Sequence, residues 1–338
     1  MPCAKYKTFL GSECLLACFH NIIKYYDLDI EECDVFLFGD GLKTIYRKFT
    51  ENSTDFILAG NVHGSVFKFC GDSKIKALIK ENLSGIGAKN DMLYYLSQDM
   101  PVTVKVDPGY LKYSPIYANG FGLTHYINIL DYNVENDSVL LSDGFIPTFP
   151  PSVYHNWHDY KLIQEGRSLK NHFYIIFDIS EFKKDKLLQN KIKENGCLKL
   201  RANLAGYLNG YEDGSFVYGI KALRQFAEDV PLLLELLGDR FSEGMFKLNY
   251  SMKINGLLSG KILLYKAFKR LKHKMNSDME HILTDELMEM VNEWNKISLL
   301  VVRSGVLRSK ESLILLSDKI KAVVSKEERV YSKILTCI

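Results

Sequence analysis

Apolar residues crowd the chain soon after its start, and polar positions are rare over residues 15–26. Ser12 is a good helix-capping residue, so the pattern predicts a helix that begins near Glu13 and is buried on most sides. A second short helix is expected over residues 30–38, because two glycines follow it closely. This part of the chain should therefore be packed inside a folded domain.

Strands are indicated further along, where β-branched residues alternate with polar ones. We expect strands over residues 101–106, 125–132, 138–143 and 172–179. A turn should occupy residues 133–137, and a loop rich in Gly, Tyr and Pro should occupy residues 107–123. Residues 72–81 and 90–96 are predicted to be helical, and residues 43–70 to form short strands and loops.

The pattern changes near residue 181, since strand signals vanish there and helical periodicity continues to the end. We predict an α+β fold with an all-α C-terminal region. The expected domains are residues 1–180 and residues 181–338.

Composition excludes several classes of protein. The net charge of +2 does not suggest a nucleic-acid partner, and no stretch approaches the roughly 18 apolar residues of a membrane-spanning helix. The seven cysteines are irregularly spaced, and residues 1–10 contain two lysines and no apolar run that would indicate a secretion signal. Both observations favour free thiols over disulfides. The expected location is a reducing cytoplasm.

Cys14 would lie in the first turn of the predicted helix, where free backbone N–H groups and the helix dipole favour a thiolate. Cys18, one turn later, lacks those N–H groups and is read as packing. Cys14, Cys18 and His20 do not suggest a zinc site, because His20 would point away from the two thiols. No metal ligands are predicted.

His125 is the preferred partner for Cys14 among eight histidines. If the turn after its strand is centred on Val134, His125 lies directly opposite Asp143 on the next strand. Opposed side chains share a face with Cβ atoms roughly 5 Å apart, so the carboxylate could orient the imidazole. A slip of one residue would destroy the pairing.

Each of these residues has an ordinary alternative. A cysteine near a helix start is usually structural, a histidine at a strand start is more often surface or core, and an Asp before Gly is commonly a turn residue. The order Cys14, His125, Asp143, with the last two paired across a hairpin, favours catalysis.

The loop of residues 107–123 carries candidate substrate contacts. Tyr110, Tyr113 and Tyr117 are expected to line the pocket, with simple loop packing as the open alternative. His155 and His158 are read as surface residues or residues at the rim of the substrate site.

Two resemblances to known families rest on these residues. The stretch Glu13–Cys18 resembles the ECGLAC sequence around the nucleophile of the bacteriocin-processing C39 peptidases, although Leu15 replaces the Gly and Thr8 stands where that group has a Gln. Residues 10 to about 180 resemble the N-terminal domain of the butirosin biosynthesis protein H family. That resemblance is carried by Cys14–Asp27, Val106–Pro115, the His125 strand and Ser142–Asp143.

The second resemblance implies a papain-like cysteine protease fold that acts as an acyltransferase in natural-product biosynthesis. Such enzymes move an acyl group from the phosphopantetheine thioester of an acyl or peptidyl carrier protein to a small amine, and amide-forming enzymes of the closthioamide type are similar. It implies Cys14 as nucleophile, His125 as base and Asp143 as the residue that orients the base. A thioester is already activated, so no cofactor is expected.

Two other functions remain open: a peptidase with the same triad, and a binding module that keeps the fold without activity. A predicted helix with Lys266, Lys269 and Arg270 on one stripe could dock an acidic carrier protein, or could simply be a solvated helix face.

Overall fold

The computed structural model describes residues 5–48, 58–82, 84–120, 122–148, 150–254, 256–274 and 280–338. Two units emerge from the contacts within the chain. Unit 1 contains Met1–Glu32 and Val66–Asn190, and unit 2 contains Cys33–Ser65 and Lys191–Ile338. Residues 49–57 of the predicted strand-and-loop stretch, and Phe121 of the predicted loop, lie outside the described residues.

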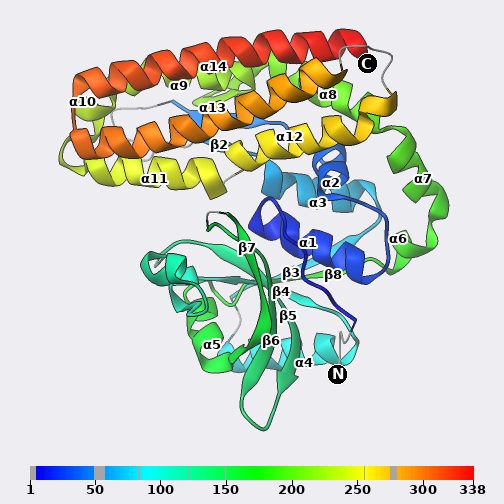
Figure 1. The fold of residues 1–338 in the computed structure, drawn as a ribbon. Coiled ribbons are helices and arrows are strands. Elements are labelled where there is room, and N and C mark those ends of the chain that lie inside the picture. The colour runs from blue at the N-terminus through cyan, green and yellow to red at the C-terminus, as the bar shows by residue number, and fades with distance from the viewer. Residues whose placement is uncertain are drawn as a thin grey trace. The chain divides into compact units, whose positions relative to one another are not determined.

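Unit 1 is built on a six-stranded antiparallel sheet in the order β3-β8-β4-β5-β6-β7 (Figure 1). Its strands are β3 (Lys76–Lys80), β4 (Val102–Val106), β5 (His125–Asn133), β6 (Ser138–Ile146), β7 (Ser152–Asp159) and β8 (Tyr174–Asp178). Its helices are α1 (Cys14–Tyr25), α4 (Gly85–Ser97), α5 (Tyr160–Ser168), α6 (Ser180–Lys184) and α7 (Lys186–Glu194, up to its fifth residue), with short 3-10 turns η1 (Pro108–Tyr110) and η2 (Pro115–Asn119).

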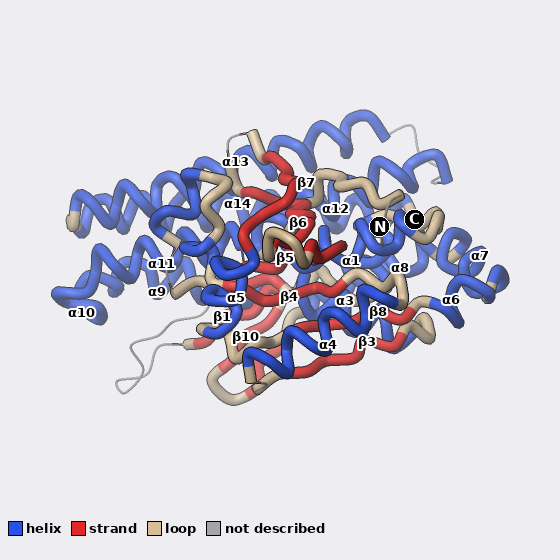
Figure 2. The backbone as a smooth tube through the Cα atoms, turned by 90° about the horizontal axis from the view of Figure 1, so that it is seen from below, coloured by secondary structure: helices blue, strands red, loops and turns tan. Residues whose placement is uncertain are grey.

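Helices cover both faces of this sheet. Ile127 and Ile129 of β5 belong to the apolar core beneath α4 and α5. Asn128, between them, points the other way and donates from Nδ2 to the carbonyl oxygen of Cys18 in α1, 2.9 Å away. Because alternate residues of a strand face opposite sides, α1 and the α4–α5 pair lie on opposite faces, and α4 can be followed along the sheet in Figure 2.

The predicted elements of unit 1 are largely confirmed, with three errors. The first helix, the hairpin strands and the strands near residues 102 and 174 are present. Residues 62–72 form helix α3 (Val62–Asp72) instead of strands and loops, and residues 76–80 form a strand instead of a helix. The pattern also missed β7 and α5. Short amphipathic runs support helix or strand equally, and tertiary pairing decides between them.

Unit 2 is mainly helical. It contains α2 (Glu32–Phe38, from its second residue), α8 (Gly196–Asn209), α9 (Ile220–Asp229), α10 (Leu233–Leu237), α11 (Phe241–Ile254), α12 (Leu257–Leu271), α13 (Glu280–Leu307) and α14 (Lys310–Cys337), with 3-10 turns η3 (Val230–Leu232), η4 (Gly238–Arg240) and η5 (Lys272–Lys274). Figure 1 shows α12, α13 and α14 lying side by side, as their contacts require. None of the described helices combines the length and the apolar character needed to cross a membrane.

A small sheet interrupts the helices of unit 2. Its order is β2-β1-β10-β9, from β1 (Thr44–Arg47), β2 (Leu58–Gly60), β9 (Tyr211–Asp213) and β10 (Phe216–Tyr218). The α+β class with a helical C-terminal region is confirmed, but the expectation that strands vanish after residue 181 is wrong. Strands of three residues are too short to show an alternating pattern. The division into residues 1–180 and 181–338 stays a prediction.

A buried ion pair joins the helices of unit 2. Lys261 Nζ of α12 lies 2.8 Å from Glu327 Oε1 of α14, and Trp294 Nε1 of α13 donates to the same oxygen. Tyr207 of α8 donates to the other carboxylate oxygen and lies 3.0 Å from Lys261 Nζ. Burial lowers the pKa of Lys261, although the nearby Glu327 opposes that shift.

Removing one partner of this pair should strongly destabilise unit 2. Glu327→Gln leaves the buried Lys261 cation without its anion, and we expect a loss of about 3–5 kcal/mol of unfolding free energy. Urea denaturation followed by Trp294 fluorescence, in a Trp157→Phe background, measures it. Lys296→Ala breaks the exposed pair with Glu293, which solvent screens, and should destabilise the protein far less than Glu327→Gln. Equal losses in the two variants would contradict the prediction.

Candidate active site

Helix α1 positions the candidate nucleophile. Cys14 is its first residue, and the N-cap is Glu13, whose Oε2 accepts a hydrogen bond from the backbone N–H of Leu16, 3.1 Å away. Ser12 was expected to cap the helix, but its N–H and Oγ both donate to the Glu32 carboxylate. A buried carboxylate one residue later caps the helix in its place.

The thiol of Cys14 is held in its neutral form. Its Sγ donates to Glu13 Oε1 over 2.8 Å, and the residue is only 2% exposed. Burial, the Glu13 charge and this hydrogen bond raise the pKa of Cys14 well above its ordinary value. A backbone hydrogen bond from Tyr126 acts in the opposite direction and lowers it. The sulfur therefore lies against the backbone of the residue that follows His125.

Cys18, the rival nucleophile, is buried as well. Burial, then the charges of Asp143 and Glu13, raise the pKa of Cys18 well above its ordinary value. All of these influences disfavour the Cys18 thiolate, whereas Cys14 has a backbone donor that favours its thiolate. Cys14 thus differs from Cys18 in two ways: a backbone donor favours its thiolate, and a hydrogen bond to Glu13 disfavours it.

His125 and Asp143 lie together, but not in the register expected from the sequence. Asn128 is opposite Ser142 and Ile129 is opposite Leu141, followed by a β-bulge toward the turn. Continuing this register places Asp143 opposite Ile127, which is two residues beyond His125. The turn is centred between Glu135 and Asn136 and not on Val134, because β5 ends at Asn133 and β6 begins at Ser138. A shift of two residues keeps both side chains on one face, as diagonal neighbours within reach of each other.

The resulting pair is short and buried. His125 Nε2 lies 2.9 Å from Asp143 Oδ2, and both side chains are almost wholly excluded from solvent. Burial alone would raise the pKa of Asp143, but the charge and hydrogen bond of His125, the Phe145 N–H and the Tyr117 hydroxyl hold it below its usual value. Asp143 is thus an ionised acceptor, so Nε2 carries the ring proton and Nδ1 can act as a base.

Not every predicted member of the triad is connected. Among the residues the structure describes, the hydrogen bonds of His125 go to Asp143 and Tyr117, and none joins it to Cys14. Cys14 is linked to the start of β5 through the backbone of Tyr126. Both contacts of the ring use Nε2, and proton exchange between Nδ1 and Cys14 stays a prediction.

The three candidate substrate tyrosines occupy different places. The hydroxyls of Tyr113 and Tyr117 each donate to Asp143 Oδ2 over 2.8 Å. Tyr110 lies in η1, which packs against α5. Sequence reasoning placed Tyr113 and Tyr117 near the site but missed their hydrogen bonds to Asp143, and their spacing in a Gly-rich loop gives no signal for such bonds. A role for all three in binding substrate stays a prediction.

Three other residues had been linked to the site. Thr8, at the place of the C39 glutamine, donates from Oγ1 to Ser142 Oγ over 2.8 Å and lies 2.7 Å from His155 Nδ1. His158 packs its ring edge-on against Tyr113, with centroids 5.5 Å apart. His155 therefore belongs to the Thr8 contact, and His158 belongs to the aromatic surroundings of Asp143.

Comparison with known proteins bears directly on this segment. Residues 13–144, which include Cys14, His125 and Asp143, match the family described as butirosin biosynthesis protein H, N-terminal. The match covers less than half of the chain, and no curated protein matched the chain. The segment is therefore similar to the N-terminal domain of a family of biosynthesis proteins, and the helices from α8 onward lie outside the matched residues.

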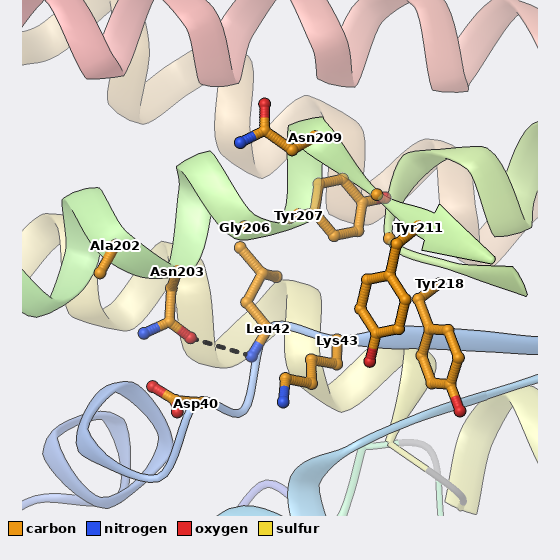
Figure 3. Close-up of a pocket in the computed structure, with 12 residues that line it drawn as sticks. Asp40, Leu42, Lys43, Ala202, Asn203, Gly206, Tyr207, Asn209, Tyr211 and Tyr218 are labelled. Atoms are coloured by element: carbon orange, nitrogen blue, oxygen red, sulfur yellow. Dashed lines mark hydrogen bonds between the residues drawn. The ribbon is translucent and has the colours of Figure 1, made fainter. Parts of the chain in front are cut away.

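Unit 2 contains a separate cavity of about 500 Å³. Of the residues that line it, only Asp40, Leu42 and Lys43 belong to the segment that matches the family. Figure 3 shows the rings of Tyr211 and Tyr218 side by side in it, near Lys43, and their stacking distance is 4.3 Å. The predicted site residues are not among those that line it.

Glu13 should suppress the reactivity of Cys14 within this domain. Glu13→Gln keeps an oxygen to cap α1 but removes the negative charge beside the thiol, so the pKa of Cys14 should fall. Alkylation by iodoacetamide near neutral pH should then accelerate, roughly tenfold for each unit of pKa lost. The measurement is the rate of labelling of the Cys14 peptide.

Glu31→Gln is the matched control, because Glu31 pairs with Lys24 and His20 further along α1. It removes one carboxylate near the same helix and should leave Cys14 labelling unchanged. Slower labelling in Glu13→Gln at unchanged thermal stability would show that Glu13 activates the thiol instead.

Proposed function

We propose that this protein is a cysteine-dependent acyltransferase that forms an amide from a carrier-protein thioester and a small amine. The observation that carries the proposal is the buried His125–Asp143 pair at the start of β5, where the neighbouring backbone contacts the Cys14 sulfur. A cysteine, a histidine and a carboxylate in this order on a biosynthetic domain support acyl transfer through a covalent intermediate.

In the first step, His125 Nδ1 takes the proton of Cys14 and the thiolate attacks the thioester carbonyl. The C–S bond to the carrier breaks, the carrier sulfur takes the proton from the imidazolium, and the acyl group remains on Cys14. Asp143 stabilises the transient imidazolium through Nε2. The neutral resting thiol makes this proton transfer part of the reaction with substrate.

In the second step, an amine attacks the Cys14 acyl-enzyme. His125 takes a proton from the attacking nitrogen and returns it to the departing Cys14 sulfur, so that the amide leaves and the resting thiol is restored. Hydrolysis of the acyl-enzyme competes with this step, and the near-complete burial of Cys14 and His125 limits access of water. The Tyr110, Tyr113 and Tyr117 segment is proposed to border the acyl group.

A peptidase with the same residues is the second candidate, favoured by the likeness of Glu13–Cys18 to the C39 nucleophile sequence. The position of Thr8 argues against it. Its hydroxyl is engaged by Ser142 and His155, so it does not supply the side-chain amide that the C39 group uses there. A peptidase would cleave peptides without any thioester donor.

Intact mass spectrometry tests the proposal. The full chain is mixed with carrier proteins that hold defined acyl thioesters, and the expected result is a mass increase equal to the acyl group, located on Cys14 by peptide mapping. Added amine should release it as an amide. Cleavage of peptides with no acyl-enzyme from any donor would replace this proposal by the peptidase.

The docking surface for the carrier is open to a direct test. Lys266 and Lys269 of α12 are exposed, whereas Arg270 lies 3.5 Å from Asp34 and is partly neutralised. Lys269→Glu should slow transfer from a carrier-bound donor several-fold and should hardly change transfer from an N-acetylcysteamine thioester. Salt should mimic the substitution, since exposed charges are screened beyond roughly 10 Å at about 0.1 M. Equal slowing of both donors would exclude α12 from docking.

A further inference from the structure

Asp143 receives more hydrogen bonds than an orienting carboxylate needs. Oδ2 accepts from His125 Nε2 at 2.9 Å, from Tyr113 at 2.8 Å and from Tyr117 at 2.8 Å, while Oδ1 accepts from the Phe145 N–H at 3.0 Å. Three donors thus converge on the single oxygen that faces the imidazole. Hydrogen bonds to an ionised acceptor are about twice as strong as neutral ones, so each of them takes up part of the charge that His125 would otherwise meet.

Tyr117 contacts both members of the pair. Its hydroxyl lies 3.0 Å from His125 Nε2 as well as 2.8 Å from Asp143 Oδ2. A hydroxyl has one proton and two lone pairs, so it can donate to the carboxylate while it accepts from the ring N–H. The ring proton is then shared between Asp143 and Tyr117, which fixes the ring plane and, in the neutral ring, leaves Nδ1 as the acceptor nitrogen.

Tyr113, whose hydroxyl donates to the same oxygen, is held in a cluster of aromatic rings. Its ring stacks on Tyr154 of β7 at a centroid distance of 3.9 Å and an interplanar angle of 9°, and meets His158 edge-on. Tyr154 itself directs its hydroxyl to the carbonyl oxygen of Trp157, not to Asp143. The packing holds the Tyr113 hydroxyl in place, and Tyr154 offers a neighbour of equal size that lacks a bond to the carboxylate.

We infer that Tyr117 and Tyr113 are positioning residues that weaken the hold of Asp143 on the His125 ring proton. The inference deepens the proposed function, on which its catalytic readout rests. A carboxylate with fewer donors would stabilise the imidazolium too well. The Cys14 thiolate would then form at lower pH, but the imidazolium would give up its proton to the departing carrier sulfur more slowly.

Each variant in the comparison that follows changes only one of the titratable groups near the pair. These groups come from α1, from the loop before β5, from β5 and from β7: Glu13, Cys14, Cys18, Tyr113, Tyr117, Tyr126, Tyr154 and His158. Each tyrosine variant removes one hydroxyl and leaves the remaining groups in place, so a change in pH dependence reports on that hydroxyl.

The experiment compares Tyr117→Phe, Tyr113→Phe and the control Tyr154→Phe. Iodoacetamide labelling of the Cys14 peptide is measured against pH, and thermal melting verifies that each variant is folded. We expect the acidic limb of labelling to move to lower pH in Tyr117→Phe and Tyr113→Phe, making labelling there about three- to tenfold faster than in wild type. Tyr154→Phe should follow the wild-type curve.

The catalytic readout should move in the opposite direction. In acyl transfer, kcat should fall about tenfold in Tyr117→Phe with little change in KM, because the variant keeps the aromatic ring that is proposed to border the acyl group and loses only the hydroxyl. An unchanged limb, or a shift to higher pH, in folded Tyr117→Phe and Tyr113→Phe overturns the inference. If the limb shifts while the wild-type protein forms no acyl-enzyme, the inference stands and the proposed function fails.

Discussion

Replacing Cys14 with alanine is expected to reduce acyl transfer by a factor of at least about 10³, because the acyl intermediate is proposed to form on the Cys14 sulfur. Cys18→Ala is the matched control. It removes a buried thiol one turn along α1. Burial and the nearby carboxylate charges disfavour the thiolate form of Cys18. Its activity should stay within a few-fold of wild type, apart from a modest loss of stability caused by the small cavity.

The measurement combines turnover with intact mass. Cys14→Ala should show no acyl adduct on the protein, and Cys18→Ala should show the same adduct as wild type. Circular dichroism and melting temperature establish that both variants fold. An active Cys14→Ala beside a folded, inactive Cys18→Ala would transfer the role of nucleophile to Cys18.

Asp143→Asn is expected to preserve the fold and reduce turnover by roughly 10²–10⁴. The amide has nearly the shape of the carboxylate, so Tyr113, Tyr117 and the Phe145 N–H retain a neighbour of the same size. It lacks the negative charge, and its NH₂ group can turn toward His125 Nε2 and impose the wrong tautomer. The base at Nδ1 is then lost in a fraction of molecules and the imidazolium is less stable in all of them.

Asp131→Asn provides the control for this variant. Asp131 is also a buried aspartate of the hairpin, but its carboxylate accepts from the backbone N–H of Tyr132 and not from His125. The rate of acyl-enzyme formation in single turnover should fall in Asp143→Asn and persist in Asp131→Asn. A near-wild-type rate in Asp143→Asn would reduce the triad to Cys14 and His125.

The pairing of His125 with Asp143 shows which structural features the pattern of apolar and polar residues can predict and which it cannot. Alternation of apolar residues correctly predicted both strands and their shared face, since Ile127, Ile129, Val139 and Leu141 fall in one core cluster. The register was wrong by two residues because the predicted turn was centred on Val134, too early in the chain, and because the bulge between Ile129 and Asp131 was not predicted. The pair survived the error only because an even shift preserves the face.

The contacts around the pair were beyond such reasoning. Glu13 was noticed only as part of a resemblance, and nothing in the order of residues showed that its carboxylate both caps α1 and binds the Cys14 thiol. Tyr113 and Tyr117 were chosen as aromatic residues of a loop, yet their hydroxyls matter more in the structure than their rings. Hydrogen bonds between residues 26 or 30 positions apart depend on how the loop folds back, which periodicity does not encode.

The predictions for the residues of helix α3 and strand β3 were wrong for a different reason. Both segments contain mixed apolar and polar residues without a clear period, and β3 becomes a strand because it pairs along its whole length with β8, about a hundred residues later. Long-range pairing of this kind overrides local preference.

The pairing of β1 with β10 has a consequence for synthesis of the chain. Tyr46 is opposite Val217, so an apolar strand made early must wait for a partner made much later. At about 5–20 residues per second, a ribosome needs roughly ten to thirty seconds to supply that partner. Until then β1 presents an unpaired edge and an uncovered aromatic side chain. A nascent chain that stalls before residue 216 is therefore an aggregation hazard, and recombinant fragments ending near residue 180 would retain that edge permanently.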